Sequence, residues 1–133
     1  MERISVTFLE TIQTLFQEKK YATLRDILTT MNPVDIAAIF EQLRDESIPL
    51  LFRMLPKELA AETFVEMDDD TQHLLIQGFS DNELKDVIDE LYVDDAVDLI
   101  EEMPSNVVRR ILKQADPDMR KEINELLFPP WGR

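Results

Sequence analysis

The chain has 133 residues, which is the usual length of one domain and is enough for a hydrophobic core. Hydrophobic residues make up 44% of it and charged residues 32%, so the composition is that of a globular protein and excludes a disordered one. The 28 acidic and 14 basic residues give a formal net charge of −14. This charge repels phosphate backbones and disfavours nucleic acid as a partner, whereas cations and basic protein surfaces suit it.

Residue types that the sequence lacks exclude several kinds of site. There is no cysteine, so a disulfide framework and a thiolate metal site are both excluded. The single histidine, His73, cannot form a zinc site, and two glycines leave no phosphate-binding loop. We therefore do not expect an enzyme. No apolar run reaches the roughly 20 residues that span a bilayer, and the N-terminus lacks the plan of a signal peptide, so we expect a soluble, cytosolic chain.

Two amphipathic segments come first in the chain. Residues 4–17 carry apolar side chains at helical spacing, among them Phe8, Ile12 and Leu15. Residues 21–29 carry Leu24 and Leu28 in the same way. The spacing predicts a helix over each segment.

A repeat of twelve residues follows. From Val34 the sequence divides into eight windows of twelve, with apolar residues recurring at the third, sixth, seventh and tenth positions. This is the spacing of one helix face. The tenth position is apolar in every window: Leu43, Leu55, Met67, Phe79, Leu91, Met103, Ala115 and Leu127. Residues that stop and start helices fill the next two positions, so we predict helices of about nine residues joined by turns of two or three.

Four residues are expected to cap helices. Ser80 with Glu83 fits a capping box. Asn32 and Asp116 each precede a proline, which suits the first position of a helix. Asp68 is placed to cap the helix that follows it.

The repeat determines the expected fold. Helices of this length are marginal alone in water, so each must pack on its neighbours. Short turns then wind consecutive helices together. We expect an all-α fold over residues 1–128, a right-handed superhelix of about ten short helices with a twelve-residue repeat. Residues 129–133 depart from the pattern and are interpreted as a linker stub or a foreign end.

The acidic residues are concentrated in one stretch. Between Glu58 and Glu102 there are 16 carboxylates and one basic residue, Lys85. Within this stretch Asp94, Asp98, Glu101 and Glu102 are spaced so that they share one helix face, and Asp95 is adjacent to it.

Like charges at this spacing repel by roughly 0.2–0.5 kcal/mol per pair, and a nearby cation would relieve that repulsion. Hard cations such as Mg²⁺ prefer oxygen ligands, and Mg²⁺ keeps several waters and takes only one or two carboxylates. The face is therefore interpreted either as a cation-responsive surface or, more plainly, as a solvated helix face.

Three motifs in order resemble a known family. Residues 32–37 (NPVDIA) resemble an "HPxDLA" opening, residues 55–62 (LPKELAAE) an "LPxxxAAE" segment and residues 91–98 (LYVDDAVD) an "LxxDDxAD" segment. Together with the helical repeat, the likeness covers about residues 5–127. The chain thus resembles the N-terminal cytosolic domain of the MgtE family of magnesium transporters.

The resemblance implies a function and its residues. Family members are homodimeric Mg²⁺ channels or transporters of the cytoplasmic membrane, in which a pair of CBS domains and a membrane domain follow this domain. Mg²⁺ binds between the acidic N-terminal domain and the acidic CBS domains when intracellular Mg²⁺ is high, and favours the closed pore. By position in the motifs, Asp94 and Asp98 would be the sensing carboxylates and Glu62 a further one. Asp95, Glu101 and Glu102 are added from the shared helix face.

The resemblance also implies a setting. The cofactor would be weakly bound, regulatory Mg²⁺. The partners would be the CBS and membrane domains, on the cytoplasmic side of the cell membrane. In the family a "YPEDSAG" segment follows; Phe128 and Pro129 match its start in kind, but residues 130–133 do not continue it.

The alternative function is an acidic helical adaptor for protein–protein interaction without a metal role, similar to the middle domain of the flagellar rotor protein FliG.

Overall fold

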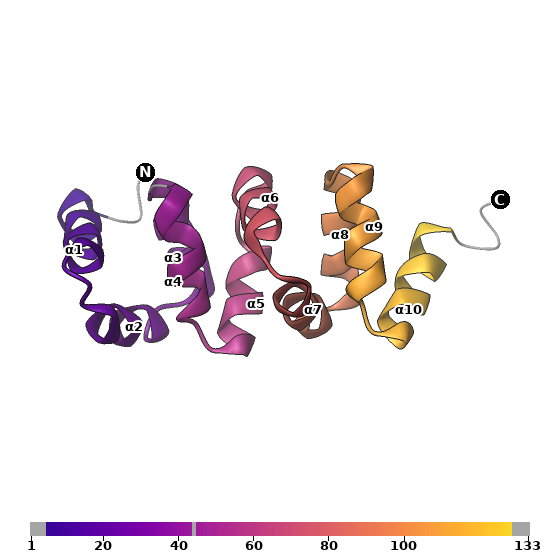
Figure 1. Ribbon diagram of the computed structural model, residues 1–133, viewed down its shortest axis with the longest axis horizontal. Coiled ribbons are helices and arrows are strands. Elements are labelled where there is room, and N and C mark those ends of the chain that lie inside the picture. The colour runs from indigo at the N-terminus through magenta and orange to yellow at the C-terminus, as the bar shows by residue number, and fades with distance from the viewer. Residues whose placement is uncertain (1–4, 44, 129–133) are drawn as a thin grey trace. The chain divides into compact units, whose positions relative to one another are not determined.

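The computed structural model describes residues 5–43 and 45–128, and no strand occurs among them. The all-α prediction is confirmed (Figure 1). The helices are α1 (Val6–Gln17), α2 (Tyr21–Thr29), α3 (Pro33–Gln42), the short 3₁₀ helix η1 (Asp45–Ser47), α4 (Ile48–Arg53), α5 (Lys57–Val65), α6 (Asp69–Gly78), α7 (Asp81–Glu90), α8 (Val93–Glu102), α9 (Ser105–Gln114) and α10 (Pro117–Leu127).

Helix starts follow the twelve-residue repeat. The helices α5 to α10 begin twelve residues apart and are 9–11 residues long, as the sequence predicts. The helices that begin at Tyr21, Pro33 and Asp45 are also spaced by twelve residues. The repeat therefore begins one window earlier than the sequence predicted. Only the window from Asp45 lacks a full-length helix. There η1 precedes the six-residue α4, which has a proline in its first turn.

Three of the four predicted caps are confirmed. Ser80 and Glu83 form both halves of the capping box, with Oγ accepting from the Glu83 N–H at 3.1 Å and the Glu83 carboxylate accepting from the Ser80 N–H at 2.9 Å. The Asn32 side chain accepts from a first-turn N–H at 3.0 Å. Asp68 Oδ1 accepts from the Thr71 N–H at 2.8 Å.

The predicted side-chain cap at Asp116 is wrong. Asp116 does precede α10, but its side chain makes no capping hydrogen bond. Its backbone N–H instead donates to Asp89 Oδ1 of α7 at 3.1 Å. Its carboxylate lies within electrostatic reach of the Lys85 ammonium. The hydrogen bond of Lys85 to Asp89 raises the pKa of Lys85 most, and Asp116 adds to that shift.

The chain divides into two compact units, residues 1–75 and 76–133. In the first unit α1 packs on α2 and α3 packs on α5. Ile36 and Phe40 of α3 and Phe64 of α5 are fully buried. Phe64 also meets Phe52 edge to face, with ring centroids 6.3 Å apart. The core of this unit thus consists of the predicted apolar positions.

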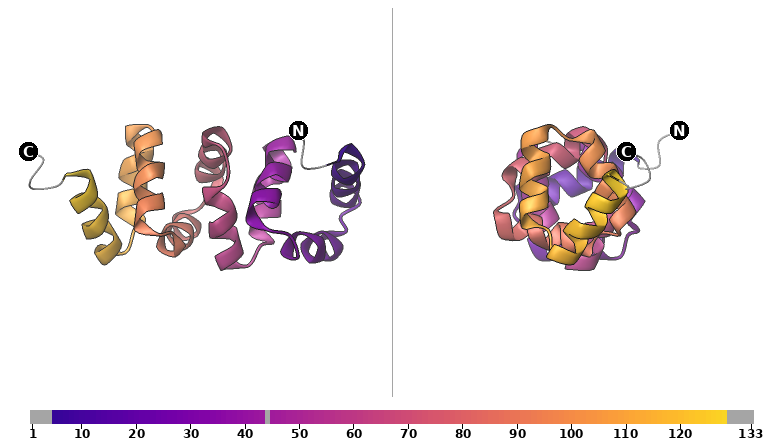
Figure 2. Two further views of the ribbon diagram at one scale, coloured as in Figure 1. Left: turned by 180° about the vertical axis from the view of Figure 1, so that it is seen from behind. Right: turned by 90° about the vertical axis from the view of Figure 1, so that its right-hand side faces the viewer.

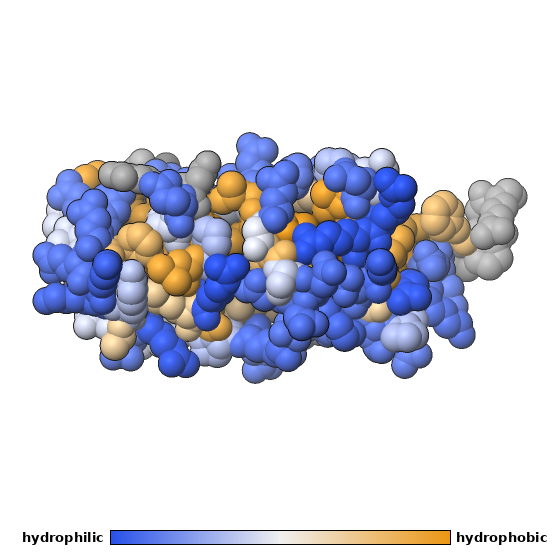
Figure 3. All heavy atoms as spheres, viewed as in Figure 1, coloured by the Kyte–Doolittle hydropathy of each residue, from blue (hydrophilic) through white to orange (hydrophobic). Residues whose placement is uncertain are grey.

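In the second unit α7 packs on α9 and α8 packs on α10. Leu84 and Ile88 of α7, Ile111 of α9 and Ile123 of α10 are fully buried. Short turns join these four helices in sequence (Figure 2). The visible face over α7 and α9 is largely hydrophilic, as expected of helices with a single buried stripe (Figure 3).

Two polar residues occupy the third position of the repeat, which was predicted to be apolar. Each donates to a carbonyl eight residues earlier, in the last turn of the preceding helix. Gln72 Nε2 donates to the Phe64 carbonyl at 2.8 Å, and Arg120 Nε donates to the Leu112 carbonyl at 2.9 Å. The last carbonyls of a helix lack partners within it, so these departures from the pattern cap helix ends.

Arg110 of α9 makes a similar contact over a longer distance in sequence. Its guanidinium donates to the carbonyls of Ile76 at 2.6 Å and Phe79 at 2.5 Å. Its Nε donates to Asp81 Oδ1 at 3.1 Å. The Arg110 side chain therefore connects α9 to the turn between α6 and α7. These contacts stabilise the second unit, which includes the acidic helix α8.

Candidate functional site

The predicted acidic face lies on α8, in the second unit. Ala96, Leu99 and Ile100 are the buried residues of this helix, so the opposite side of the helix faces outward. Asp94 and Asp98 lie on that outward side and are exposed. The local sequence produces this arrangement, because apolar residues at helical spacing anchor one stripe and leave the acids to the other.

The other predicted residues of α8 differ in exposure. Glu101 and Glu102 are exposed and extend the row toward the end of the helix. Asp95 is half-buried, because it lies at the edge of the face, next to the buried stripe. Asp94 and Asp95 both belong to the first turn, where negative charge interacts favourably with the helix dipole.

Glu62 belongs to α5, in the first unit. It is exposed and has Glu58 and Glu66, both exposed, one turn before and after it. This second acidic row was not predicted from the sequence, although the spacing of four residues between its members indicates it.

Tyr92 is a further surface residue that the sequence analysis did not single out. It directly precedes α8 and is 83% exposed, the largest exposure among the large apolar and aromatic side chains described. Its position in the turn, outside the repeat's apolar positions, could have indicated this exposure. An aromatic side chain therefore flanks the acidic face at the start of the helix.

The acidic rows do not form a closed metal site by themselves. Within residues 5–43 and 45–128, no three histidine, aspartate or glutamate side chains gather closely enough to hold a metal ion. An open row of this kind can offer one or two carboxylates to a hydrated divalent cation, and the remaining ligands must come from water or from another surface.

The acidic rows contribute negative charge and carboxylate oxygens to the surface. The described helices hold no span long and apolar enough to cross a membrane. What the surface provides is a concentrated negative field on short helices.

Residues 31–128 match the family described as the MgtE intracellular N domain. The chain belongs to the MgtE N-domain family. No curated protein matches it. Among solved structures, the cytosolic domain of the Mg²⁺ channel MgtE in complex with ATP is similar at 25% identity and a TM-score of 0.78, over 89% of this chain and 49% of that one. The soluble part of a magnesium transporter is similar in fold at 17% identity and a TM-score of 0.77, over 90% and 48%.

The MgtE resemblance stated from the three motifs is thereby confirmed at the level of the family. The chain spans about half the length of the solved chains that it matches. The matched range begins just before Asn32 and includes α3 to α10, and so contains every predicted sensing residue. Residues 129–133, interpreted as a linker stub or foreign end, lie outside the described residues.

Proposed function

We propose that this MgtE N domain is a Mg²⁺-responsive regulatory domain of a magnesium transporter, and that it senses Mg²⁺ through the outward face of α8. Asp94 and Asp98 are the central carboxylates, with Glu101, Glu102 and Asp95 beside them. Glu62 supplies a second, separate contact from α5. The observation that carries the proposal is the exposed acidic row on α8 in a chain of this family.

In the proposed mechanism the second half of the Mg²⁺ site lies on another acidic surface of the transporter, the CBS domains. At low Mg²⁺ the two negative surfaces repel each other. Hydrated Mg²⁺ at high concentration screens and bridges them, because each carboxylate row alone offers too few ligands. The ion thus binds the docked arrangement more tightly than the separated one, and this difference shifts the population toward the closed pore.

The setting of the proposal is the cytoplasmic side of the cell membrane, with a homodimeric parent transporter. The domain acts by binding and not by catalysis. Support comes from the likeness to the cytosolic domain of a Mg²⁺ channel and from the net charge of −14. The Mg²⁺ is weakly bound and regulatory, because this chain holds only one side of each contact.

The proposal is tested by following backbone amide NMR shifts of the chain while MgCl₂ is added at constant ionic strength. Shifts concentrated on α8 around Asp94 and Asp98 are expected. They should disappear in Asp94→Asn plus Asp98→Asn. The matched control is Asp118→Asn plus Glu122→Gln, an exposed pair on α10 with the same spacing and the same first-turn start. Small, uniform shifts that NaCl reproduces would refute sensing by this face and favour the metal-free adaptor.

A further inference from the structure

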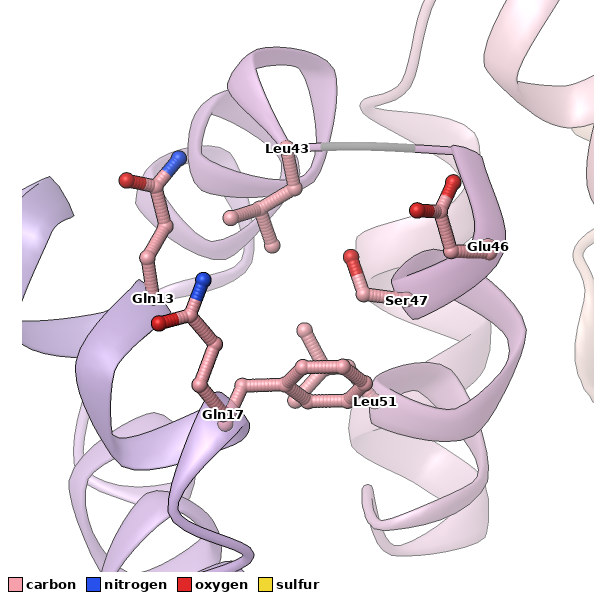
Figure 4. A pocket seen from close by; sticks show the side chains of 7 residues that line it. Gln13, Gln17, Leu43, Glu46, Ser47 and Leu51 are labelled. Atoms are coloured by element: carbon pink, nitrogen blue, oxygen red, sulfur yellow. The ribbon is translucent and has the colours of Figure 1, made fainter.

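Two surface features have no role in the proposed Mg²⁺ contacts, and the first is a pocket in the first unit. It lies beside α1, the end of α3 and the η1–α4 segment, and has a volume of about 130 Å³ (Figure 4). Its lining mixes amide, carboxylate, hydroxyl and carbon groups, among them Gln13, Phe16, Gln17, Glu46, Ser47 and Leu51. Residues 1–57 hold eight acidic and seven basic residues, so the net charge of this part of the chain is close to zero. The pocket therefore selects no single class of ligand.

The second feature is Tyr92, the residue that directly precedes α8. Its side chain is 83% exposed, although most large apolar and aromatic side chains of the described ranges are buried. Tyr92 occupies the N-cap position of α8, but its side chain makes no capping hydrogen bond. It forms no ring contact with another aromatic residue of residues 5–43 and 45–128 either. The ring therefore contributes neither to the cap of the helix nor to the core.

Carboxylates flank Tyr92 on both sides in the sequence. Glu90 lies two residues before it, and Asp94 and Asp95 lie two and three residues after it. Glu90 and Asp94 are exposed, and Asp95 is half-buried. The side chains of the N-cap residue and of the third residue of a helix lie close together, which brings Asp95 near Tyr92. None of these three carboxylates forms a hydrogen bond or an ion pair with another residue of the described ranges.

We propose that Tyr92 and these carboxylates bind an arginine side chain on a basic surface of a partner protein. A guanidinium stacks on an aromatic face and carries five N–H donors in its plane. One arginine can therefore cover the Tyr92 ring and pair with Asp94 or Asp95 at the same time. A lysine ammonium is a compact, strongly hydrated charge and matches this combination less well.

The charge of the surrounding sequence selects a cationic partner. Between Glu58 and Glu102, the stretch that contains Tyr92, there are 16 carboxylates and one basic residue. This charge attracts a basic protein surface and repels nucleic acid and anionic lipid. Aromatic side chains and arginine are also the residues that are enriched where proteins meet.

The arginine contact does not rest on Mg²⁺ sensing, although both use Asp94. The contact requires the Tyr92 ring, whereas a hydrated Mg²⁺ ion requires only carboxylates of α8. A bound arginine occupies the Asp94 carboxylate, so the basic partner and Mg²⁺ compete for the start of the acidic face.

The test uses the whole chain and two peptides of equal charge at low ionic strength. One peptide alternates three arginines with two glycines, and the other has lysine in place of each arginine. Saturable amide NMR shifts are expected at Glu90, Tyr92, Asp94 and Asp95. The arginine Hδ protons should move upfield, because they lie over the Tyr92 ring. The lysine peptide should bind about two- to fivefold more weakly, which is the factor that stacking of a cation contributes at an exposed site.

Substitution of Tyr92 separates stacking from charge attraction. Tyr92→Leu should weaken binding of the arginine peptide about two- to fivefold, abolish the upfield shift and remove the preference over lysine. Tyr92→Phe keeps the ring and should bind as the parent chain does. Phe128→Leu removes another exposed aromatic side chain, after α10, and is the matched control that should change nothing.

Equal affinity for the two peptides in the parent chain, or unchanged binding of the arginine peptide in Tyr92→Leu, would overturn the proposal. Absence of the upfield shift would do so too. The Mg²⁺-dependent shifts on α8 should persist in Tyr92→Leu, so failure of the arginine contact is distinguishable from failure of Mg²⁺ sensing.

Discussion

Replacement of Thr63 by valine tests the packing of the first unit most sharply. The Thr63 side chain is 0% exposed, and its Oγ1 has no hydrogen-bond partner among the described residues. The other seven windows hold an aliphatic residue at this position: Ile39, Leu51, Leu75, Val87, Leu99, Ile111 and Ile123. Thr63→Val replaces the hydroxyl with a methyl group of similar size and restores the pattern of the repeat.

The magnitude follows from the burial of that hydroxyl. An unpaired buried polar group costs about 1–3 kcal/mol, and the buried methyl that replaces it contributes about 0.8 kcal/mol. Part of this gain is offset by imperfect fit, because a methyl is slightly larger than a hydroxyl. We expect the free energy of unfolding to rise by about 1–2 kcal/mol, which corresponds to about 3–6 °C in Tm for a chain of this length.

The assay is urea and thermal unfolding followed by circular dichroism at 222 nm, a wavelength that reports helix content. Thr23→Val, at an exposed position of α2, is the matched control and should change stability by less than about 0.5 kcal/mol. A loss of stability in Thr63→Val, with the control unchanged, would show that the hydroxyl is satisfied by a partner such as bound water. The unpaired-hydroxyl reasoning would then be refuted.

Three further changes probe other contacts. Lys19 follows α1 with φ at 59°, a left-handed conformation that favours glycine, so Lys19→Gly should raise the free energy of unfolding in urea by about 0.5–1 kcal/mol; a fall would contradict this. Arg110→Met should cost about 2–3 kcal/mol in urea unfolding, because two helix-end carbonyls lose a charged donor. Arg109 is exposed, so Arg109→Met should lower the free energy of unfolding by less than about 0.5 kcal/mol. Equal losses in the two variants would contradict a stabilising role for the Arg110 hydrogen bonds. Burial, followed by the Asp68 charge, raises the pKa of Glu41 above its ordinary value. The folded state therefore holds this proton more tightly, and the associated stability is lost as pH rises through the raised pKa. Glu41→Gln should have a higher free energy of unfolding than the parent chain at pH 7, and this difference should become smaller toward pH 4. A difference that does not change with pH would contradict the raised pKa of Glu41.

Local sequence signals predicted the helices well. The apolar positions set which face of each helix is buried, and the residues between them set where each helix begins, so the starts from Lys57 to Pro117 follow the repeat. The capping box at Ser80 was equally predictable, since both of its hydrogen bonds span only three residues. The outward position of Asp94 and Asp98 follows from the same pattern.

Contacts between distant residues were not predictable. Arg110 reaches carbonyls more than 30 residues away, and no periodic pattern specifies which carbonyls those are. The Asp116 side chain does not cap α10, and the Asp116 backbone N–H instead bonds to Asp89 of α7. This contact depends on how α7 and α9 pack. The pocket beside α1 likewise depends on packing between segments well separated in sequence. The family match supplied what the helix pattern could not, because many functions share one helical fold.

Sensing of Mg²⁺ by the α8 face is tested most directly by measuring how intracellular Mg²⁺ inhibits the intact transporter. Asp94→Asn plus Asp98→Asn should raise the half-inhibitory Mg²⁺ concentration about fivefold or more, since coupling of this kind is typically worth 1–3 kcal/mol. Asp118→Asn plus Glu122→Gln should leave it unchanged. An unaltered half-inhibitory concentration in the α8 variant, or an equal shift in the α10 control, would contradict the proposed role of Asp94 and Asp98.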